Sequence, residues 1–347
     1  MKATKNYPLE FTGHGGEYFR IWIVNIALSL ITLGIYSAWA KVRTKRWFYS
    51  HTLLDNNPFS YLATPMQILK GRLIAATFLI IYVISSNISP LISGSMMLVL
   101  GIASPWIIVM ALRFAARQSA YRGLRLHFSG TVGEAAVVYL LLPITTIFTL
   151  GLSLPYTAYR QVRYLASNYS YGQTATIYTG TMKPFWGVYL IALALLLIPF
   201  GILGFGAFRA YGMIAMGIPK ELAMASMAGF LIGGVTTLYL TIPILTAFIQ
   251  ARKANLFYNH LELGEIRFTS AQRARDLIWI YLSNLVLIAL TVGLYIPFAM
   301  VRITRYRIHR LQVYGNNLDN FVTQSSENIN ATGSEISDLF DMDIGIA

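Results

Sequence analysis

The chain has 347 residues, of which 56% are hydrophobic and only 12% are charged. A soluble protein is normally about one-quarter charged, so this composition excludes an ordinary soluble domain. The formal net charge is +13, and the absence of cysteine excludes disulfides, thiolate catalysis and cysteine-ligated metal sites.

The first feature along the chain is a polar N-terminal stretch followed by an apolar segment at residues 18–40. No small-residue cleavage site follows that segment, so we expect no cleavable signal peptide. Later apolar segments have the length of bilayer-spanning helices, and we predict a polytopic membrane protein. They are residues 73–92, 96–112, 135–154, 185–208, 224–249 and 277–300.

The apolar segment at residues 18–40 is interrupted by Thr-Leu-Gly and then becomes basic, and this pattern recurs twice. Residues 31–47 align without gaps on 148–164 and on 290–306. Each copy has a threonine, a glycine two residues later, and two arginines of which the second precedes an aromatic residue. The matching positions are Thr32, Thr149 and Thr291; Gly34, Gly151 and Gly293; Arg43, Arg160 and Arg302; and Arg46, Arg163 and Arg305. An acid also recurs near the start of each segment (Glu17, Glu134 and Asp276), and Asn25 matches Asn284.

Two longer units lie between these copies, so the sequence predicts five repeat-like units in a membrane domain at residues 1–321. The units cover 11–60, 64–128, 128–180, 181–268 and 268–321. Each is apolar, then basic and aromatic, then short and polar, and the polar stretches suggest small β-hairpins. Residues 322–347 are rich in acids and lack Lys and Arg, which is typical of a disordered acidic tail.

Two interpretations fit the Thr-x-Gly interruption in each of the three copies. It is either a kink in one helix that crosses the membrane, or a turn between two helices that fold back on each other. Seven crossings would put eleven of the 27 bases on one face and sixteen on the other. Folding back puts 25 on one face and leaves only Arg209 and Lys220 on the other. Since cytoplasmic loops carry excess Lys and Arg, we favour three re-entrant helical hairpins plus four full spans, with both termini cytoplasmic.

The predicted fold is therefore an all-α polytopic membrane protein with small cytoplasmic β-hairpins. Folding back would bring each acid to the depth of the arginines of its own unit. We accordingly expect three sets of ion pairs, in which the carboxylates lower the cost of arginines close to hydrocarbon. They would join Glu17 to Arg43 and Arg46, Glu134 to Arg160 and Arg163, and Asp276 to Arg302 and Arg305.

Residues 11–49, FTGHGGEYFRIWIVNIALSLITLGIYSAWAKVRTKRWFY, resemble the signature of the YjgN-like family of bacterial inner-membrane proteins, a domain of unknown function. The similarity continues to about residue 316. One departure is Ala38, where the family often has proline before the tryptophan; the later copies keep Pro155 and Pro297. The resemblance implies a location in the bacterial inner membrane and no particular activity.

The sequence offers no catalytic constellation, no Gly-rich phosphate loop and no metal-ligand spacing, so we expect a non-enzymatic protein without cofactors or metals. Interrupted helices can line a transport path, which makes a transport or channel-like protein the first hypothesis. Its path would lie near Thr32, Gly34, Thr149, Gly151, Thr291, Gly293, Asn25 and Asn284.

The alternative is a membrane-organising or scaffolding protein whose hairpins insert into one leaflet. In this reading the arginine and aromatic residues form a rim that binds anionic lipid headgroups. The same residues also suit simple anchoring at the interface. Membrane lipids are the expected partners, a homo-oligomer is a further expectation, and nucleic acid is not, since membrane topology already accounts for the positive charge.

Overall fold

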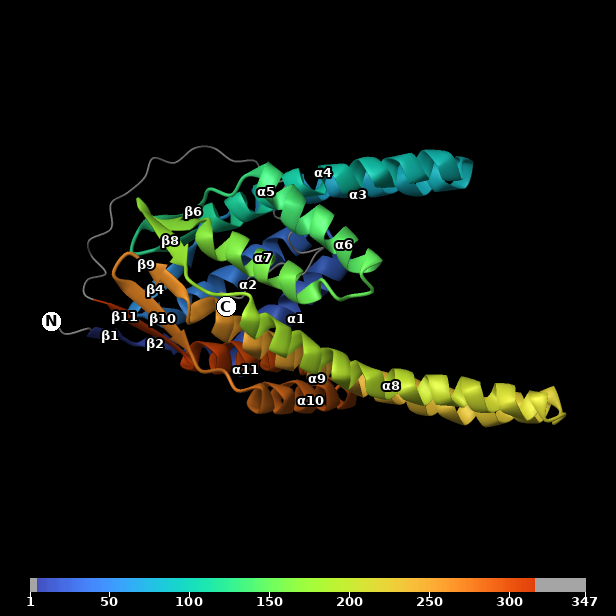
Figure 1. The fold of residues 1–347 in the computed structure, drawn as a ribbon. Helices are drawn as coiled ribbons and strands as arrows, with labels where there is room; N and C mark the ends of the chain where they lie inside the picture. The colour runs from blue at the N-terminus through green and yellow to red at the C-terminus, as the bar shows by residue number, and fades with distance from the viewer. Residues whose placement is uncertain (1–4, 316–347) are drawn as a thin grey trace.

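In the computed structural model, which describes residues 5–315, all helix pairs begin and end at one antiparallel β-sheet (Figure 1). Its eleven strands have the order β1-β11-β10-β9-β8-β7-β6-β5-β4-β3-β2. They are β1 Lys5–Tyr7, β2 Leu9–Phe11, β3 Thr52–Leu54, β4 Asn57–Tyr61, β5 Ser119–Tyr121, β6 Leu124–Phe128, β7 Tyr169–Tyr171, β8 Thr174–Tyr178, β9 Leu261–Leu263, β10 Ile266–Ser270 and β11 Leu311–Gly315.

The sheet is a nearly closed barrel, because its two outermost strands are consecutive in the chain. β1 pairs with β11 and β2 pairs with β3, and only Pro8 separates β1 from β2. The Pro8 carbonyl still accepts a hydrogen bond from the Asp55 N–H at 2.9 Å. One bent segment at residues 5–11 thus joins the first and last parts of the chain, and few strand edges remain unpaired.

The prediction of an all-α fold with small β-hairpins was wrong. The hairpins exist, but each also pairs with its neighbours: β4 with β5, β6 with β7, β8 with β9 and β10 with β11. Since an isolated two-stranded hairpin is marginally stable in water, this pairing is what makes strands of three to five residues persist.

Three short helix pairs alternate along the chain with two long ones. The short pairs are α1 Gly15–Ile31 with α2 Ser37–Ser50, then α5 Val132–Ala136, η1 Val137–Leu141 and α6 Leu142–Phe148 with α7 Leu154–Ser167, and finally α10 Ala274–Leu290 with α11 Ile296–His309. The long pairs are α3 Pro65–Ile88 with α4 Pro90–Gln118 and α8 Lys183–Ala215 with α9 Lys220–Tyr258. Figure 1 shows the two long pairs lying apart from each other and projecting in the same direction, beyond the short ones.

The four long helices are long and apolar enough to span a membrane. The 33 residues of α8 reach about 50 Å, whereas the 17 residues of α1 reach about 25 Å, at a rise of about 1.5 Å per residue. The hydrocarbon core of a bilayer is about 30 Å thick. Only the long pairs therefore have the reach of a full span.

The helix pairs form a ring, with each pair packed on the next and the last packed on the first. Tyr18 of the first pair lies in one buried cluster with Val301 and Ile308 of the last. Leu277 of α10 packs on Ala247 and Ala251 of α9 in the same way. Neighbouring pairs also meet at every strand junction, so sheet and helices form one body.

Each short pair reverses direction through the same five-residue turn. Its backbone hydrogen bonds form a Schellman motif, in which the last carbonyls of the first helix are satisfied within the turn. In the first pair, the Leu33 N–H donates to the Leu30 carbonyl at 3.2 Å and the Gly34 N–H to the Ser29 carbonyl at 2.7 Å. The other two pairs repeat these bonds at Leu150 and Gly151 and at Val292 and Gly293. The interruptions are therefore turns between separate helices rather than kinks.

We expect Gly34→Ala to destabilise the protein, because Gly34 has a φ of +92°, where a side chain is strained by about 1 kcal/mol. Gly94→Ala is the matched control: Gly94 lies within α4 with open space around it, and alanine should stabilise that helix by about 0.5–1 kcal/mol. Midpoints of unfolding in detergent titrations measure both changes. Shifts in the same direction would contradict the turn geometry.

Candidate functional site

The three turns proposed as the site end in exposed apolar side chains. Leu33 and Leu150 are each 94% exposed and Val292 is 92% exposed. The flanking positions are apolar and exposed as well, including Ile31, Phe148 and Leu290. Such tips suit contact with hydrocarbon, which does not compete for backbone hydrogen bonds.

The turn threonines have their hydrogen-bonding capacity satisfied locally. Thr32 Oγ1 donates to the Leu28 carbonyl at 2.7 Å and accepts from the Tyr36 N–H at 2.9 Å. Thr149 and Thr291 repeat both bonds. The threonine thus joins the end of one helix to the start of the next, and its hydroxyl has a structural role.

Asn25 and Asn284 are buried between the two helices of the first and last pairs. Asn25 Nδ2 donates to the Ala40 carbonyl at 3.5 Å, and Asn284 Oδ1 accepts from Arg302 Nη1 at 3.1 Å. Arg302 also donates to Ser283 Oγ at 2.8 Å. Each asparagine thus bridges the two helices of its own pair, and one amide atom of each has no partner in the described part of the chain.

One repeated position, an arginine in three units and Asn255 in a fourth, joins four of the helix pairs to the following one. This position lies six residues before the strand that follows its helix pair. Its side chain donates to a backbone carbonyl of the following unit, two residues after the strand that leads into the next helix pair. Because the last bond returns to the first unit, these contacts close the ring. The bonds are Arg46 to Ala63 (2.9 Å), Arg113 to Gly130 (3.1 Å), Asn255 to Gln272 (2.8 Å) and Arg305 to Gly13 (2.7 Å). We call these four contacts the ring bonds.

The equivalent Arg163 makes no ring bond in the described residues; Arg163 Nη1 donates to Tyr159 Oη of its own helix at 3.5 Å. Arg160 likewise donates to Tyr156 Oη at 2.8 Å. The second short pair is therefore held to the following long pair mainly by packing, in which Ala158 and Val162 contact the buried Phe185.

The expected acid–arginine pairs are not formed as the alignment suggested. Glu17 lies 3.8 Å from His51 Nε2, and Asp276 lies 3.2 Å from Arg310 Nη2. For residues 5–315, no recorded ion pair joins Glu17, Glu134 or Asp276 to the arginines predicted for it. Arg46 and Arg305 instead reach across to backbone carbonyls of the next unit, and Arg302 reaches its own Asn284.

A cleft of about 650 Å³ lies between α10, α11 and the start of α1. Its lining combines Arg302, Arg305, His309 and Arg310 with aromatic side chains such as Phe298. The sequence identified Arg302 and Arg305 as rim residues. It did not place His309 and Arg310 with them, although Arg302, Arg305 and His309 lie at helical spacing on α11 and Arg310 follows its last residue.

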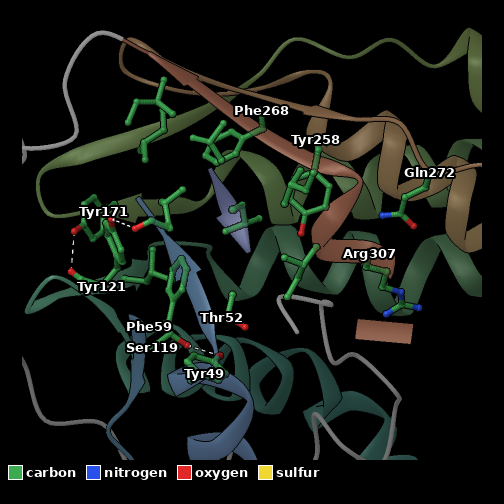
Figure 2. A pocket seen from close by; sticks show the side chains of 18 residues that line it. Tyr49, Thr52, Phe59, Ser119, Tyr121, Tyr171, Tyr258, Phe268, Gln272 and Arg307 are labelled. Carbon is green, nitrogen blue, oxygen red and sulfur yellow. Dashed lines mark hydrogen bonds between the residues drawn. The ribbon is translucent and has the colours of Figure 1, made fainter. Parts of the chain in front are cut away.

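A second hollow lies inside the barrel, and it was not predicted from the sequence. It holds about 200 Å³ and its polar lining includes Tyr258, Gln272 and Arg307 (Figure 2). The signal that could have found it is a departure from the repeat, because the positions equivalent to Gln272 and Arg307 in the other units are small or apolar.

Comparison with known proteins gives two kinds of match. A family described as bacterial protein of unknown function, DUF898, matches residues 6–339. Inner membrane protein YjgN of Salmonella typhimurium is 26% identical, covering 91% of this chain and 90% of that protein. Inner membrane protein YjgN of Escherichia coli O157:H7 is 30% identical over 42% of this chain and 37% of its own length. No solved structure matches significantly.

Proposed function

The chain belongs to this DUF898 family of bacterial proteins, whose curated relatives are named inner membrane proteins, and from that premise we propose that it shapes or organises the inner membrane. The observation that carries the proposal is an asymmetry. Within residues 5–315, ten helical arms leave the sheet, but only the four long helices continue past the turns of the short pairs (Figure 1).

This asymmetry makes the protein a wedge. A helix with its side chains is about 10 Å across, so each arm displaces a similar area of lipid. The leaflet beside the sheet would accommodate ten arms and the opposite leaflet four. A larger cross-section in one leaflet favours a membrane that is convex on that side.

The short pairs suit insertion because nothing polar is left unsatisfied at their ends. The turn N–H groups donate within the turn, the threonine hydroxyls are paired, and the outermost side chains are Leu33, Leu150 and Val292. A transport path would instead require polar groups free to contact a solute. The tips therefore support the scaffolding hypothesis over the transport hypothesis.

We place the sheet on the cytoplasmic side. Arg209 and Lys220 lie near the ends of α8 and α9 that are remote from the sheet, while the other bases of the described residues cluster towards the sheet. Positive charge beside membrane helices favours the cytoplasmic face and its anionic lipids. In this orientation, the basic cleft beside α11 meets phosphate headgroups through Arg302, Arg305 and Arg310.

The test is sorting between membranes of different curvature. Labelled protein would be reconstituted, with the sheet outward, into giant vesicles containing anionic lipid, and narrow tubes would be drawn from them. We expect the protein-to-lipid fluorescence ratio to be higher on the tube than on the vesicle. An equal ratio at every tube radius contradicts the wedge.

A flux assay on the same proteoliposomes tests the competing function. We expect ion and small-solute permeability to match that of protein-free vesicles. A protein-dependent flux that disappears in Gly151→Leu or Asn284→Leu would favour transport instead. Gly151→Leu alters a turn away from the basic cleft, whereas Asn284→Leu also removes a hydrogen-bond acceptor of Arg302, which lines that cleft.

A further inference from the structure

The barrel contains a cavity whose wall is formed by residues at equivalent positions of successive repeat units. Residues at the third position of alternate strands point inward and pack together; they are Leu54, Tyr121, Tyr171, Leu263 and Val313. Phe59, Leu126 and Phe268 pack against them from the intervening strands. About 200 Å³ remains unfilled among these side chains (Figure 2). Interiors are normally close-packed, so a void of this size is unusual.

The tyrosine hydroxyls in the wall are already used. Tyr121 Oη donates to the Leu54 carbonyl and Tyr171 Oη to the Tyr121 carbonyl, each at 2.8 Å. Tyr49 and Ser119 hydrogen-bond to each other at 2.9 Å. This part of the cavity therefore presents an apolar, largely aromatic surface to any occupant.

The end of the cavity nearest the helices differs, because Gln272 and Arg307 lie there together with Tyr258 (Figure 2). Gln272 is only 6% exposed, and its Oε1 has no hydrogen-bond partner among residues 5–315. Its backbone is fixed on both sides by Asn255, at 3.0 Å to the N–H and 2.8 Å to the carbonyl. A buried acceptor without a partner beside a cavity is costly unless a rotation of the amide lets a bound molecule donate to it.

Arg307 is the second unusual group. It donates to Gln250 Oε1 and, at 3.0 Å, to Tyr281 Oη, and both partners are neutral. No ion pair recorded within residues 5–315 includes Arg307. A partly buried guanidinium without a counter-charge favours a further oxygen acceptor nearby.

Neither residue is required by the repeat. The positions equivalent to Gln272, two residues after each incoming strand, hold Gly13, Ala63, Gly130 and Gly180. Those equivalent to Arg307 hold Phe48, Ala115, Leu165 and Phe257. Two independent departures from a fivefold pattern thus converge on the same hollow.

We propose that this cavity binds a small neutral apolar molecule that carries one hydroxyl group, such as a single-ring aromatic alcohol. The hydroxyl donates to Gln272 Oε1 and its oxygen accepts from Arg307, while the ring contacts the aromatic wall. The volume agrees, since a cavity of about 150 Å³ in another protein holds benzene. The site is separate from the membrane-inserted turns and does not depend on the proposed membrane function.

Ligand-observed NMR on the purified full chain in detergent tests the proposal, with empty micelles as the reference for partitioning. The probes are benzyl alcohol, toluene and benzoate. We expect benzyl alcohol to bind most tightly, because toluene cannot satisfy Gln272 and benzoate would place a charge in the apolar cavity. Equal binding of toluene and benzyl alcohol, or tighter binding of benzoate, overturns the proposal.

Three variants locate the binding. Gln272→Leu should weaken benzyl alcohol about tenfold and leave toluene unchanged, because one hydrogen bond is lost. Leu263→Phe should fill the cavity and abolish binding of both. Ile177→Phe is the matched control, since Ile177 lies on β8 and is 58% exposed. Retention of binding in folded Leu263→Phe, or its loss in Ile177→Phe, places the ligand elsewhere and overturns the assignment.

Discussion

Lysine at the three turn tips should abolish the preference for curved membranes. The variant combines Leu33→Lys, Leu150→Lys and Val292→Lys, all at positions that are more than nine-tenths exposed. Placing a lysine at the middle of a bilayer costs about 2.5 kcal/mol or more on insertion scales. Three such charges would hold the short pairs near the headgroups and remove the extra cross-section from that leaflet. We expect the tube-to-vesicle ratio to fall to that of lipid alone.

The matched control puts a lysine at the turn of a long pair, which lies farther from the sheet than the short turns (Figure 1). Leu91 is 85% exposed and lies at the start of α4, where the first long pair turns back. If the long pairs span the membrane, this turn reaches water, and Leu91→Lys should change neither insertion nor sorting. A loss of sorting in Leu91→Lys, or its persistence in the triple variant, would contradict insertion of the short pairs.

Local features of this fold could be predicted because each depends on neighbouring residues. The repeat located the three Thr-x-Gly breaks, and the distribution of positive charge favoured a turn over a kink at each of them. The four long helices could be read from apolar length alone. The polar stretches around Asn, Asp and Gly correctly suggested hairpins at Asp55–Asn56 and Arg122–Gly123, where φ is positive.

The barrel could not be predicted, because its pairing is not local. Lys5 pairs with Gly315, and Phe59 pairs with Tyr121. Strands of three to five residues are too short to show alternation, and no periodicity reveals which hairpin lies beside which. The contacts of the candidate site could not be predicted for the same reason, because several of them join residues of different units. Alignment placed each acid and arginine at similar depth in one unit, but the side chains of Arg46 and Arg305 reach the adjacent unit.

Removing the ring bond of Arg305 should open the barrel where its first and last parts meet, at the β1–β11 pairing, which we call the seam. Arg305→Met keeps a long apolar stem but leaves the Gly13 carbonyl without the guanidinium, whose Nη2 lies 2.7 Å away. Hydrogen bonds to charged groups contribute about 1.5–3 kcal/mol, so we expect a loss of stability of that size. Arg163→Met is the matched control, because Arg163 bonds only within its own helix at 3.5 Å and should cost less than about 0.5 kcal/mol.

A disulfide across the seam distinguishes opening of the ring from a general loss of stability. Asn6 and Tyr314 are partners in the β1–β11 pairing. The chain has no native cysteine, so two introduced cysteines can pair only with each other. Directly opposed residues in antiparallel strands have the Cα separation that a disulfide requires. A disulfide formed in the double variant Asn6→Cys, Tyr314→Cys should stabilise the Arg305→Met protein more than the wild type, because the crosslink restores closure of the barrel. The same crosslink should stabilise Arg163→Met and the wild type equally. An equal increment in all three backgrounds would show that Arg305 acts away from the seam.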